Sequence, residues 1–345
     1  MQRAINIDGG WNKSWRSNCP EGSQRGSIFF VVLWTIVLLA IFAVSLGHRV
    51  QQKIRFVNRL EDKNKVYLIA LAGVNRAIAQ IKAKKKEYPE YDCLKDTWSS
   101  NPESFREIPA GEGKFSISYS HRSWENGDVL SRFGAIDEER KINVNKAGRE
   151  MISFLFQRQT GFDRTQADEI ATAIIDWRDA DSKNSPLESI EELLLIKSID
   201  EKTFSRIKDY VTVYTDGKIN INTVEGLVLV CLGLKEELAD KIIRFRRGHD
   251  SIEATDDDNA FSAISNIISD LHQFCELSQE ERQNLSNLIS QGLFTVCSEN
   301  FMIKSQGKLD GRDEYCKIVC IFRTQEGKIV YWQRQNLGLA SETLS

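Results

Sequence analysis

Apolar residues run without a charge from Ile28 to near Gly47. These about 19 mostly apolar residues, at about 1.5 Å per residue, match the hydrocarbon thickness of a bilayer. Beyond Gly47, apolar side chains recur near helical spacing between charged ones, and no proline interrupts residues 28–87. The pattern predicts one helix from about Ile28 to Ala83, about 84 Å long, with an apolar half in lipid and an amphipathic half covering a folded domain.

Three interpretations compete for this apolar segment. A cleaved secretory signal normally has an apolar core of roughly 7–15 residues, which is shorter than this one, although Ala43-Val-Ser resembles a small-residue cleavage site. The others are an ordinary signal anchor and a prepilin leader cut on the cytoplasmic side, between Gly26 and Ser27. The long amphipathic continuation favours the prepilin interpretation, because a plain anchor rarely needs one.

The distribution of positive charge argues against the expected orientation. The leader carries Arg3, Lys13, Arg16 and Arg25, and the 18 residues after Gly47 carry six Lys or Arg. Charge bias alone would place the C-terminal side in the cytoplasm. Because the downstream cations lie on a continuous helix rather than a loop, we nevertheless expect the C-terminal domain outside the cytoplasm.

Strand signals flank a helical block in the rest of the chain. Alternation over residues 115–119 predicts a strand, residues 142–290 are mostly helical in pattern, and residues 291–334 return to strand character. A turn at Gln325-Glu-Gly separates the last two predicted strands, which indicates a hairpin. The simplest architecture is an α+β domain with an all-α domain inserted between its strands.

The helical block contains an internal repeat. Ile142-Asn-Val-Asn is echoed 77 residues later by Ile219-Asn-Ile-Asn, and each is followed by a helix, a Gly-containing turn and a second helix. These units resemble helix-hairpin-helix, or SAM-like, modules. The turn at Ile196-Lys-Ser-Ile-Asp has no glycine to expose backbone N–H groups to a phosphate, and Asp200 adds a negative charge. We therefore expect a protein-interaction scaffold and no nucleic-acid partner.

Composition and motifs argue against an enzyme. The net charge is −3, and the four histidines are scattered without metal-ligand spacing. No nucleophile elbow or phosphate-binding loop occurs in the sequence. None of the seven cysteines forms a Cys-x-x-Cys pair, so a zinc ribbon or thioredoxin-type site is not expected.

The cysteines fit buried positions or a disulfide. Cys316 and Cys320 share a strand face but would lie roughly 13 Å apart, too far to bridge each other. The simplest interpretation is that the cysteines are small buried apolar residues. A disulfide from Cys297 to a C-terminal partner is the alternative in an extracytoplasmic domain.

Four segments, in this order, carry a resemblance to a known family. They are Gly134-Ala-Ile-Asp-Glu-Glu-Arg-Lys-Ile-Asn-Val-Asn, Ile174-Ile-Asp-Trp-Arg-Asp-Ala-Asp, Glu191-Glu-Leu-Leu-Leu-Ile-Lys, and Tyr210-Val-Thr-Val-Tyr with Ile219-Asn-Ile-Asn-Thr. With the pilin-like N-terminus, the ordered set resembles minor pseudopilin K of the type II secretion system (general secretion pathway protein K). The resemblance covers nearly the whole chain after residue 25.

The resemblance implies an α+β fold in which a pilin-like long N-terminal helix packs on a small antiparallel sheet, with an inserted all-α, SAM-like domain. The expected division is a leader (1–26), the transmembrane half of the helix (27–47), the pilin-like helix and first strands (48–140), the inserted helical domain (141–290), and the C-terminal strands (291–345).

The resemblance also implies a role in protein export. The chain would sit in the inner membrane with a single span and a periplasmic C-terminal domain. It would assemble with minor pseudopilins I and J at the tip of the pseudopilus, initiate the fibre, and support export of folded proteins across the outer membrane. A prepilin peptidase would cut between Gly26 and Ser27, the new Ser27 amine would be methylated, and the inner-membrane secretion platform would add subunits below.

Val31 gives the tip position a physical basis. Counting Ser27 as position one, Val31 occupies position five, where major pilins carry Glu. A carboxylate in the bilayer is costly and needs a partner, which in the fibre is the N-terminal amine of the subunit above. Val31 needs no such partner, so the chain could leave the membrane with nothing above it. The alternative is that Val31 simply faces lipid.

Several features depart from the family or leave it open. The family's Gly-Ala-Glu segment is missing after Asp-Trp-Arg-Asp, and position one is Ser rather than Phe or Met. The family can bind calcium in this neighbourhood, and oxygen ligands there are offered by Asp176, Asp179, Asp181, Asn184 and Glu188. Calcium takes about 6–8 oxygen ligands; a solvated acidic loop is the alternative, and no other cofactor is expected.

Two further functions stay open at this point. One is a membrane-anchored helix-hairpin-helix protein that binds DNA for uptake. The other is a secreted hydrolase with an atypical signal, cut after Ser45.

Overall fold

A computed structural model describes residues 24–122, 124, 127–179 and 185–338. The chain divides into two units, Met1–Leu60 and Glu61–Ser345. Each unit is described by itself.

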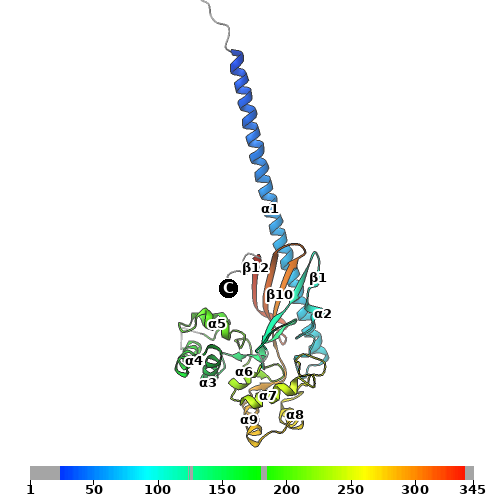
Figure 1. Cartoon of the computed structure of the whole chain (residues 1–345), viewed down its shortest axis with the longest axis vertical. Coiled ribbons are helices and arrows are strands. Elements are labelled where there is room, and N and C mark those ends of the chain that lie inside the picture. Colours follow the sequence, from blue (N-terminus) through cyan, green and yellow to red (C-terminus); the bar gives the residue numbers. More distant parts are fainter. Residues whose placement is uncertain (1–23, 123, 125–126, 180–184, 339–345) are drawn as a thin grey trace, which may run out of the picture. The chain divides into compact units, whose positions relative to one another are not determined.

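The first helix, α1, runs over Gln24–Glu87 (Figure 1). It confirms the single uninterrupted helix, which begins and ends a few residues beyond the predicted bounds. It stops just before Pro89, because a proline disfavours helical backbone in the residue that precedes it. Three basic residues, Lys84 to Lys86, occupy the last turn, where cations interact favourably with the helix dipole. In the first unit, every side chain from Ile28 to Leu60 is exposed.

The second unit contains a six-stranded antiparallel sheet. Its path is β1-β2-β10-β11-β12, with β5 paired to β10. The strands are β1 (Ile108–Ala110), β2 (Gly113–Ile117), β5 (Ile136–Asp137), β10 (Asn300–Leu309), β11 (Glu314–Arg323) and β12 (Lys328–Gly338). The predicted C-terminal hairpin is β11–β12, and β10 joins β2 across the helical block.

The strand predicted over residues 115–119 is broken in the structure. Strand β2 ends at Ile117, and Tyr119 begins β3 (Tyr119–Arg122), which leaves the sheet to pair with β4 (Val129–Arg132). Two short elements flank this region, α2 (Pro102–Phe105) and the 3-10 turn η1 (Glu138–Arg140).

The C-terminal part of α1 packs on one face of the sheet. Its residues Val66, Ala70 and Val74 share a buried cluster with Ile303 of β10 and Ile318 of β11. The hydroxyl of Ser305 donates a 2.8 Å hydrogen bond to the carbonyl of Ala70.

Cys316 and Cys320 lie on the same face of β11 and are fully buried, as expected for small apolar residues. The cysteines within the described residues are all free, so the disulfide considered for Cys297 to either of these two is wrong. Cys19 lies outside the described residues.

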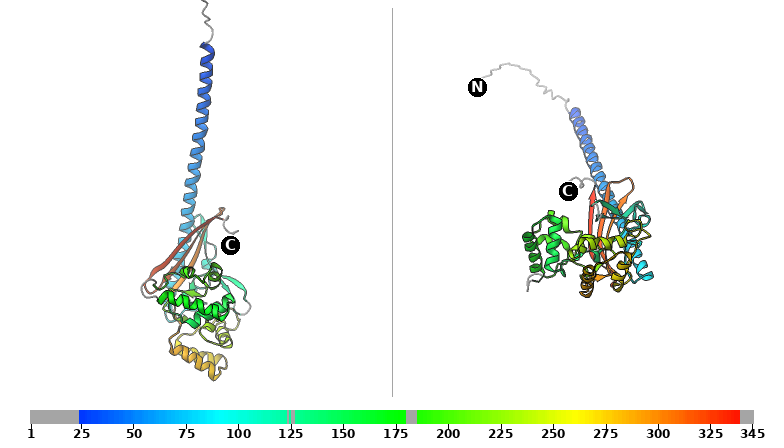
Figure 2. Two further views of the ribbon diagram at one scale, coloured as in Figure 1. Left: turned by 90° about the vertical axis from the view of Figure 1, so that its left-hand side faces the viewer. Right: turned by 60° about the horizontal axis from the view of Figure 1, so that its bottom comes forward.

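The helical block consists of two repeats with a similar order of elements, which we call the first and second helical units. The first runs through β6 (Ile142–Asn143), α3 (Arg149–Thr160), α4 (Arg164–Asp179), η2 (Ile190–Leu195), α5 (Glu201–Ile207) and β7 (Val211–Thr212). The second runs through β8 (Ile219–Asn220), α6 (Gly226–Cys231), α7 (Glu236–Arg246), η3 (Ile264–Asn266), α8 (Ile267–Phe274), α9 (Gln279–Ser290) and β9 (Phe294–Thr295). Figure 2 shows α3, α4 and α5 in green grouped apart from α8 and α9 in yellow to orange.

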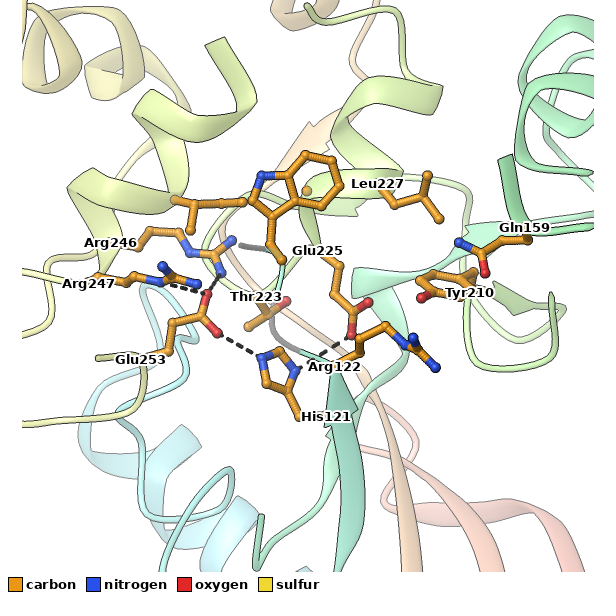
Figure 3. Close-up of a pocket in the computed structure, with 13 residues that line it drawn as sticks. His121, Arg122, Gln159, Tyr210, Thr223, Glu225, Leu227, Arg246, Arg247 and Glu253 are labelled. Carbon is orange, nitrogen blue, oxygen red and sulfur yellow. Dashed lines mark hydrogen bonds and ion pairs between the residues drawn. The ribbon is translucent and has the colours of Figure 1, made fainter. Parts of the chain in front are cut away.

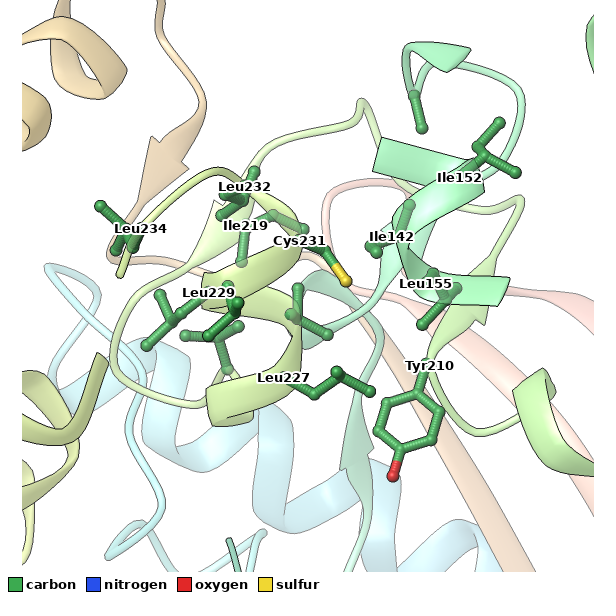
Figure 4. Close-up of a cluster of buried hydrophobic side chains, with 14 of the residues drawn as sticks. Ile142, Ile152, Leu155, Tyr210, Ile219, Leu227, Leu229, Cys231, Leu232 and Leu234 are labelled. Carbon is green, nitrogen blue, oxygen red and sulfur yellow. The ribbon is translucent and has the colours of Figure 1, made fainter. Parts of the chain in front are cut away.

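Each unit is closed by a short parallel strand pair. Strand β6 pairs with β7, and β8 pairs with β9. Side chains from both units enter one buried cluster, where Ile142 and Leu155 of the first lie near Ile219 and Leu229 of the second (Figure 4). The repeat seen in the sequence is thus a structural repeat that shares one core.

Candidate functional site

The paired Ile-Asn motifs hold equivalent turns in the two units. The side-chain Oδ1 of Asn143 accepts the N–H of Asn145 at 2.8 Å, and Oδ1 of Asn220 accepts the N–H of Asn222 at 3.0 Å. Asparagine suits this position because its side chain can hydrogen-bond the backbone two residues ahead.

The second asparagine of each motif binds the backbone of a distant loop. Asn145 accepts the N–H of Leu187 at 2.9 Å and donates to its carbonyl at 2.8 Å. Asn222 does the same with Phe261, at 2.8 and 3.0 Å. Both asparagines therefore fasten the returning chain of their unit through two hydrogen bonds.

An arginine at the end of the second helix completes each turn. Arg178 donates to the carbonyls of Val144 and Ala147 at 2.7 and 2.8 Å. Arg246 donates to the matching carbonyls, Ile221 and Val224, at 3.2 and 2.6 Å. The Asp-Trp-Arg-Asp segment thus supplies a structural arginine.

The turn considered for DNA contact is closed by its own carboxylate. Asp200 caps α5 by accepting the N–H of Thr203 at 2.8 Å. Hydrogen bonding from Thr203 lowers the pKa of Asp200, which keeps the negative charge at this helix start. A phosphate would meet this charge instead of a free N–H group.

The predicted processing and assembly residues lie at the start of α1. Val31 is 60% exposed on the helix surface. The described helix Ile28–Glu87 is long and apolar enough to cross a membrane, which fits a single-pass anchor. The backbone of Gly26 and Ser27 belongs to α1, and the preceding leader residues 1–23 lie outside the described residues.

The calcium candidates are only partly described. Asp176, Asp179 and Glu188 are exposed, and Asp181 and Asn184 lie outside the described residues. Within the described ranges, no group of three or more acidic, His or Cys side chains is placed to hold a metal. The three described carboxylates therefore do not form a site by themselves, and calcium binding through the 180–184 segment stays a prediction.

A buried charged cluster, absent from the sequence-based expectations, surrounds His121 of β3 (Figure 3). The His121 ring lies between two carboxylates, with Nε2 3.1 Å from Oε2 of Glu253 and Nδ1 3.7 Å from Oε1 of Glu225. Arg246 and Arg132 also reach Glu253, at 2.8 and 3.1 Å. Burial alone would raise the pKa of Glu253, but the hydrogen bond from His121 and the charges of Arg246 and Arg132 hold that pKa well below its usual range.

This cluster fastens the β3–β4 hairpin to the second helical unit. Arg140 pairs with Glu225, which stands at the start of α6. Trp124 lies over Gly226, where a Cβ atom would be 2.4 Å from the indole ring, and donates to Oδ1 of Asp240 at 2.5 Å. Its members come from two segments, residues 121–140 and 225–253, that are 85 or more residues apart. No sequence pattern links the two segments, so the cluster could not be predicted from the sequence.

Comparison with known proteins agrees with this architecture. Residues 134–216 match the family described as "Type II secretion system (T2SS), protein K". The fold matches a chain in the crystal structure of the GspK-GspI-GspJ complex from the enterotoxigenic Escherichia coli type 2 secretion system, with a TM-score of 0.55 and 13% identity. That match covers 81% of this chain and 99% of the other. No curated protein sequence matches the chain. The family match and the shared fold support the resemblance to minor pseudopilin K.

Proposed function

We propose that this type II secretion protein K caps the tip of the pseudopilus, where it initiates the fibre and supports export of folded proteins across the outer membrane. The observation that carries the proposal is Val31, an apolar residue on an apolar helix at the position of the pilin Glu. A subunit without that carboxylate leaves no unpaired charge in the bilayer when nothing stands above it.

The insertion between the sheet strands gives a second, steric argument. Strand β10 pairs with β2 although the whole helical block separates them in sequence. A subunit inside a fibre has neighbours above and below, and each must accommodate this added bulk. A subunit at the end has neighbours on one side only, so the end position suits this chain best.

We propose minor pseudopilins I and J as its partners. The solved structure that shares its fold is that of a GspK-GspI-GspJ complex. The repeated asparagines and arginines of the helical block bind backbone groups of their own chain, a role that suits a scaffold. The expected test is co-purification of the full-length chain with I and J from detergent-solubilised membranes.

Processing and topology follow from the same proposal. A prepilin peptidase would cut between Gly26 and Ser27, the Ser27 amine would be methylated, and the secretion platform in the inner membrane would extract the chain with its C-terminal domain in the periplasm. Mass spectrometry of the mature N-terminus tests this directly. A methylated Ser27 start supports the proposal, whereas an intact Met1 would contradict it.

The same experiments separate the competing functions. A mature N-terminus after Ser45 would favour a secreted hydrolase. Salt-dependent DNA binding by the full-length chain, without association with I and J, would favour DNA uptake, because phosphate contacts make affinity fall with salt.

A further inference from the structure

A polar hollow lies on the face of the sheet opposite α1. Ile303 and Ser305 of β10 face α1, so Lys304 between them points to the other side. Lys304 stands opposite Val319, and Lys317 stands opposite Gln306. The two lysines are therefore diagonal neighbours on one face, about 7–8 Å apart at the backbone, and both line the hollow.

The positive charge of this hollow is not balanced. Among the described contacts, neither the Lys304 nor the Lys317 ammonium has a hydrogen bond or an ion pair. Arg140 and Lys141 also line the hollow, but each is engaged, Arg140 with Glu225 and Lys141 with Glu138.

The remaining lining charges are exposed. Lys208 and Asp209 follow α5, and the carboxylate of Asp209 lies close enough to Lys304 to raise the pKa of that ammonium. With Glu138 counted as the partner of Lys141, five cations (Arg140, Lys141, Lys208, Lys304 and Lys317) stand against three carboxylates (Glu138, Asp209 and Glu225), an excess of two positive charges.

The pKa of Lys304 shows mainly the cost of burying its ammonium group. Burial, with the neighbouring charges of Lys141 and Lys317, lowers the pKa of Lys304 to about 8, and the carboxylates of Asp209 and Glu138 offset this only in part. Burying an ammonium group without an ion-pair partner costs free energy of folding, and an anion that binds only the folded state would offset that cost.

Serine hydroxyls line the opposite wall. Ser120 of β3 stands directly across from Ser131 of β4, and Ser118 precedes them. In the described part of the chain, these three hydroxyls make no side-chain hydrogen bond with the protein. The hollow therefore combines ammonium groups with free hydroxyl donors from separate strands.

We propose that this hollow binds a phosphate-type oxyanion between Lys304, Lys317 and the serine hydroxyls. Ammonium groups act as point charges, which suit a tetrahedral oxyanion approached from several directions. A planar carboxylate favours the bidentate fork of an arginine, and the arginine here, Arg140, is already paired. The ligand is either the free ion or a phosphoryl group on a larger molecule. This inference does not depend on the proposed function.

The test is titration calorimetry of the full-length protein in detergent, with inorganic phosphate and with glycerol 3-phosphate, at an ionic strength fixed by chloride. Saturable binding of inorganic phosphate alone assigns the site to the free ion, and binding of both compounds assigns it to phosphoryl groups generally. Lys304→Met and Lys317→Met should each weaken binding about tenfold or more, the usual effect of losing one charge-assisted hydrogen bond.

The matched control is Lys308→Met. Lys308 lies on the same strand and the same face as Lys304, is exposed, and does not line the hollow. The Lys308→Met variant should bind phosphate with the same affinity as the wild type. Equal weakening in all three variants would overturn the proposal, because it would reveal only general charge screening.

Two further readouts separate a ligand site from a structural lysine. Near pH 8, binding should draw a proton onto Lys304, so the heat should depend more strongly on the buffer's ionisation enthalpy in the wild type than in Lys304→Met, where only the ligand's own ionisation contributes. Without phosphate, Lys304→Met should raise the melting temperature, since it removes a largely buried ammonium group that has no ion pair among the described contacts. The proposal fails if phosphate produces no more effect than chloride, or if Lys304→Met unfolds the protein while phosphate leaves wild-type stability unchanged.

Discussion

Gly307 of β10 lies so close to Ala70 of α1 that a Cβ atom on Gly307 would stand 2.4 Å from the Ala70 backbone nitrogen. The same atom would lie 2.5 Å from the carbonyl oxygen of Val66. Both neighbours are backbone atoms of a helix, which cannot turn aside as a side chain would. The absence of a side chain at this position lets the strand and the helix pack in direct contact.

Gly307→Ala should therefore destabilise the fold by about 2–3 kcal/mol, the usual cost of overpacking a rigid contact. Urea denaturation of the full-length protein in detergent measures the change. The matched control is Gly148→Ala, where a Cβ atom meets nothing within 4 Å. It should cost less than about 1 kcal/mol, the price of exchanging glycine at a helix start. Equal losses in the two variants would show that the helix–strand contact is looser than described.

Asn222 should matter more for stability than an exposed asparagine. Its amide makes both hydrogen bonds to the buried backbone of Phe261, so Asn222→Ala leaves a buried donor and a buried acceptor unpaired. The expected loss is about 2–4 kcal/mol. The control, Asn287→Ala on the exposed face of α9, should change the free energy of unfolding by less than about 0.5 kcal/mol. Similar values for both would refute the clamping role of the repeated asparagines.

Asp258 should make the fold less stable as the pH rises from about 4 to 6. Burial raises the pKa of Asp258 to about 6, despite the hydrogen bond that it accepts from the N–H of Ala254. The unfolded value is about 3.9. A raised folded pKa contributes stability that is fully present below the unfolded value and is lost as the pH passes through the folded value.

Asp258→Asn removes this titration and can keep the bond from Ala254. The variant should gain about 1–2 kcal/mol relative to the wild type between pH 4 and pH 7, measured by denaturation at each pH. The exposed neighbour variant Asp256→Asn should follow the wild-type curve. If the difference in unfolding free energy between Asp258→Asn and the wild type did not change with pH, the raised pKa of Asp258 would be contradicted.

The sequence predicted those helices and strands whose hydrophobic period runs over many residues or whose turn residues are distinctive. The helix α1 and the β11–β12 hairpin followed from periodicity and a turn. Strand character was predicted for residues 291–334 as a whole, but Lys304, Gln306 and Lys308 of β10 do not by themselves look like a strand interior. Pairing with strands on both sides holds this polar segment extended.

The closing strand pairs were beyond the reach of the sequence. Strands β6 and β8 are two residues long, which is too short to show a period, and each is defined by a partner about 70 residues away. The repeat was visible, but the roles of Asn145 and Asn222 depend on loops that end nearby only in the folded chain. The Lys304–Lys317 hollow and the His121 cluster likewise arise from tertiary contacts between distant segments.

The central claim is that this chain occupies the end of the fibre because it lacks the intramembrane acid. The most direct measurement is immunogold labelling of the full-length chain on pseudopili sheared from cells and viewed by electron microscopy. We predict label at one end of each fibre, and loss of that label in a Val31→Glu variant but not in Val31→Leu. Label distributed along the fibre shaft would contradict the account.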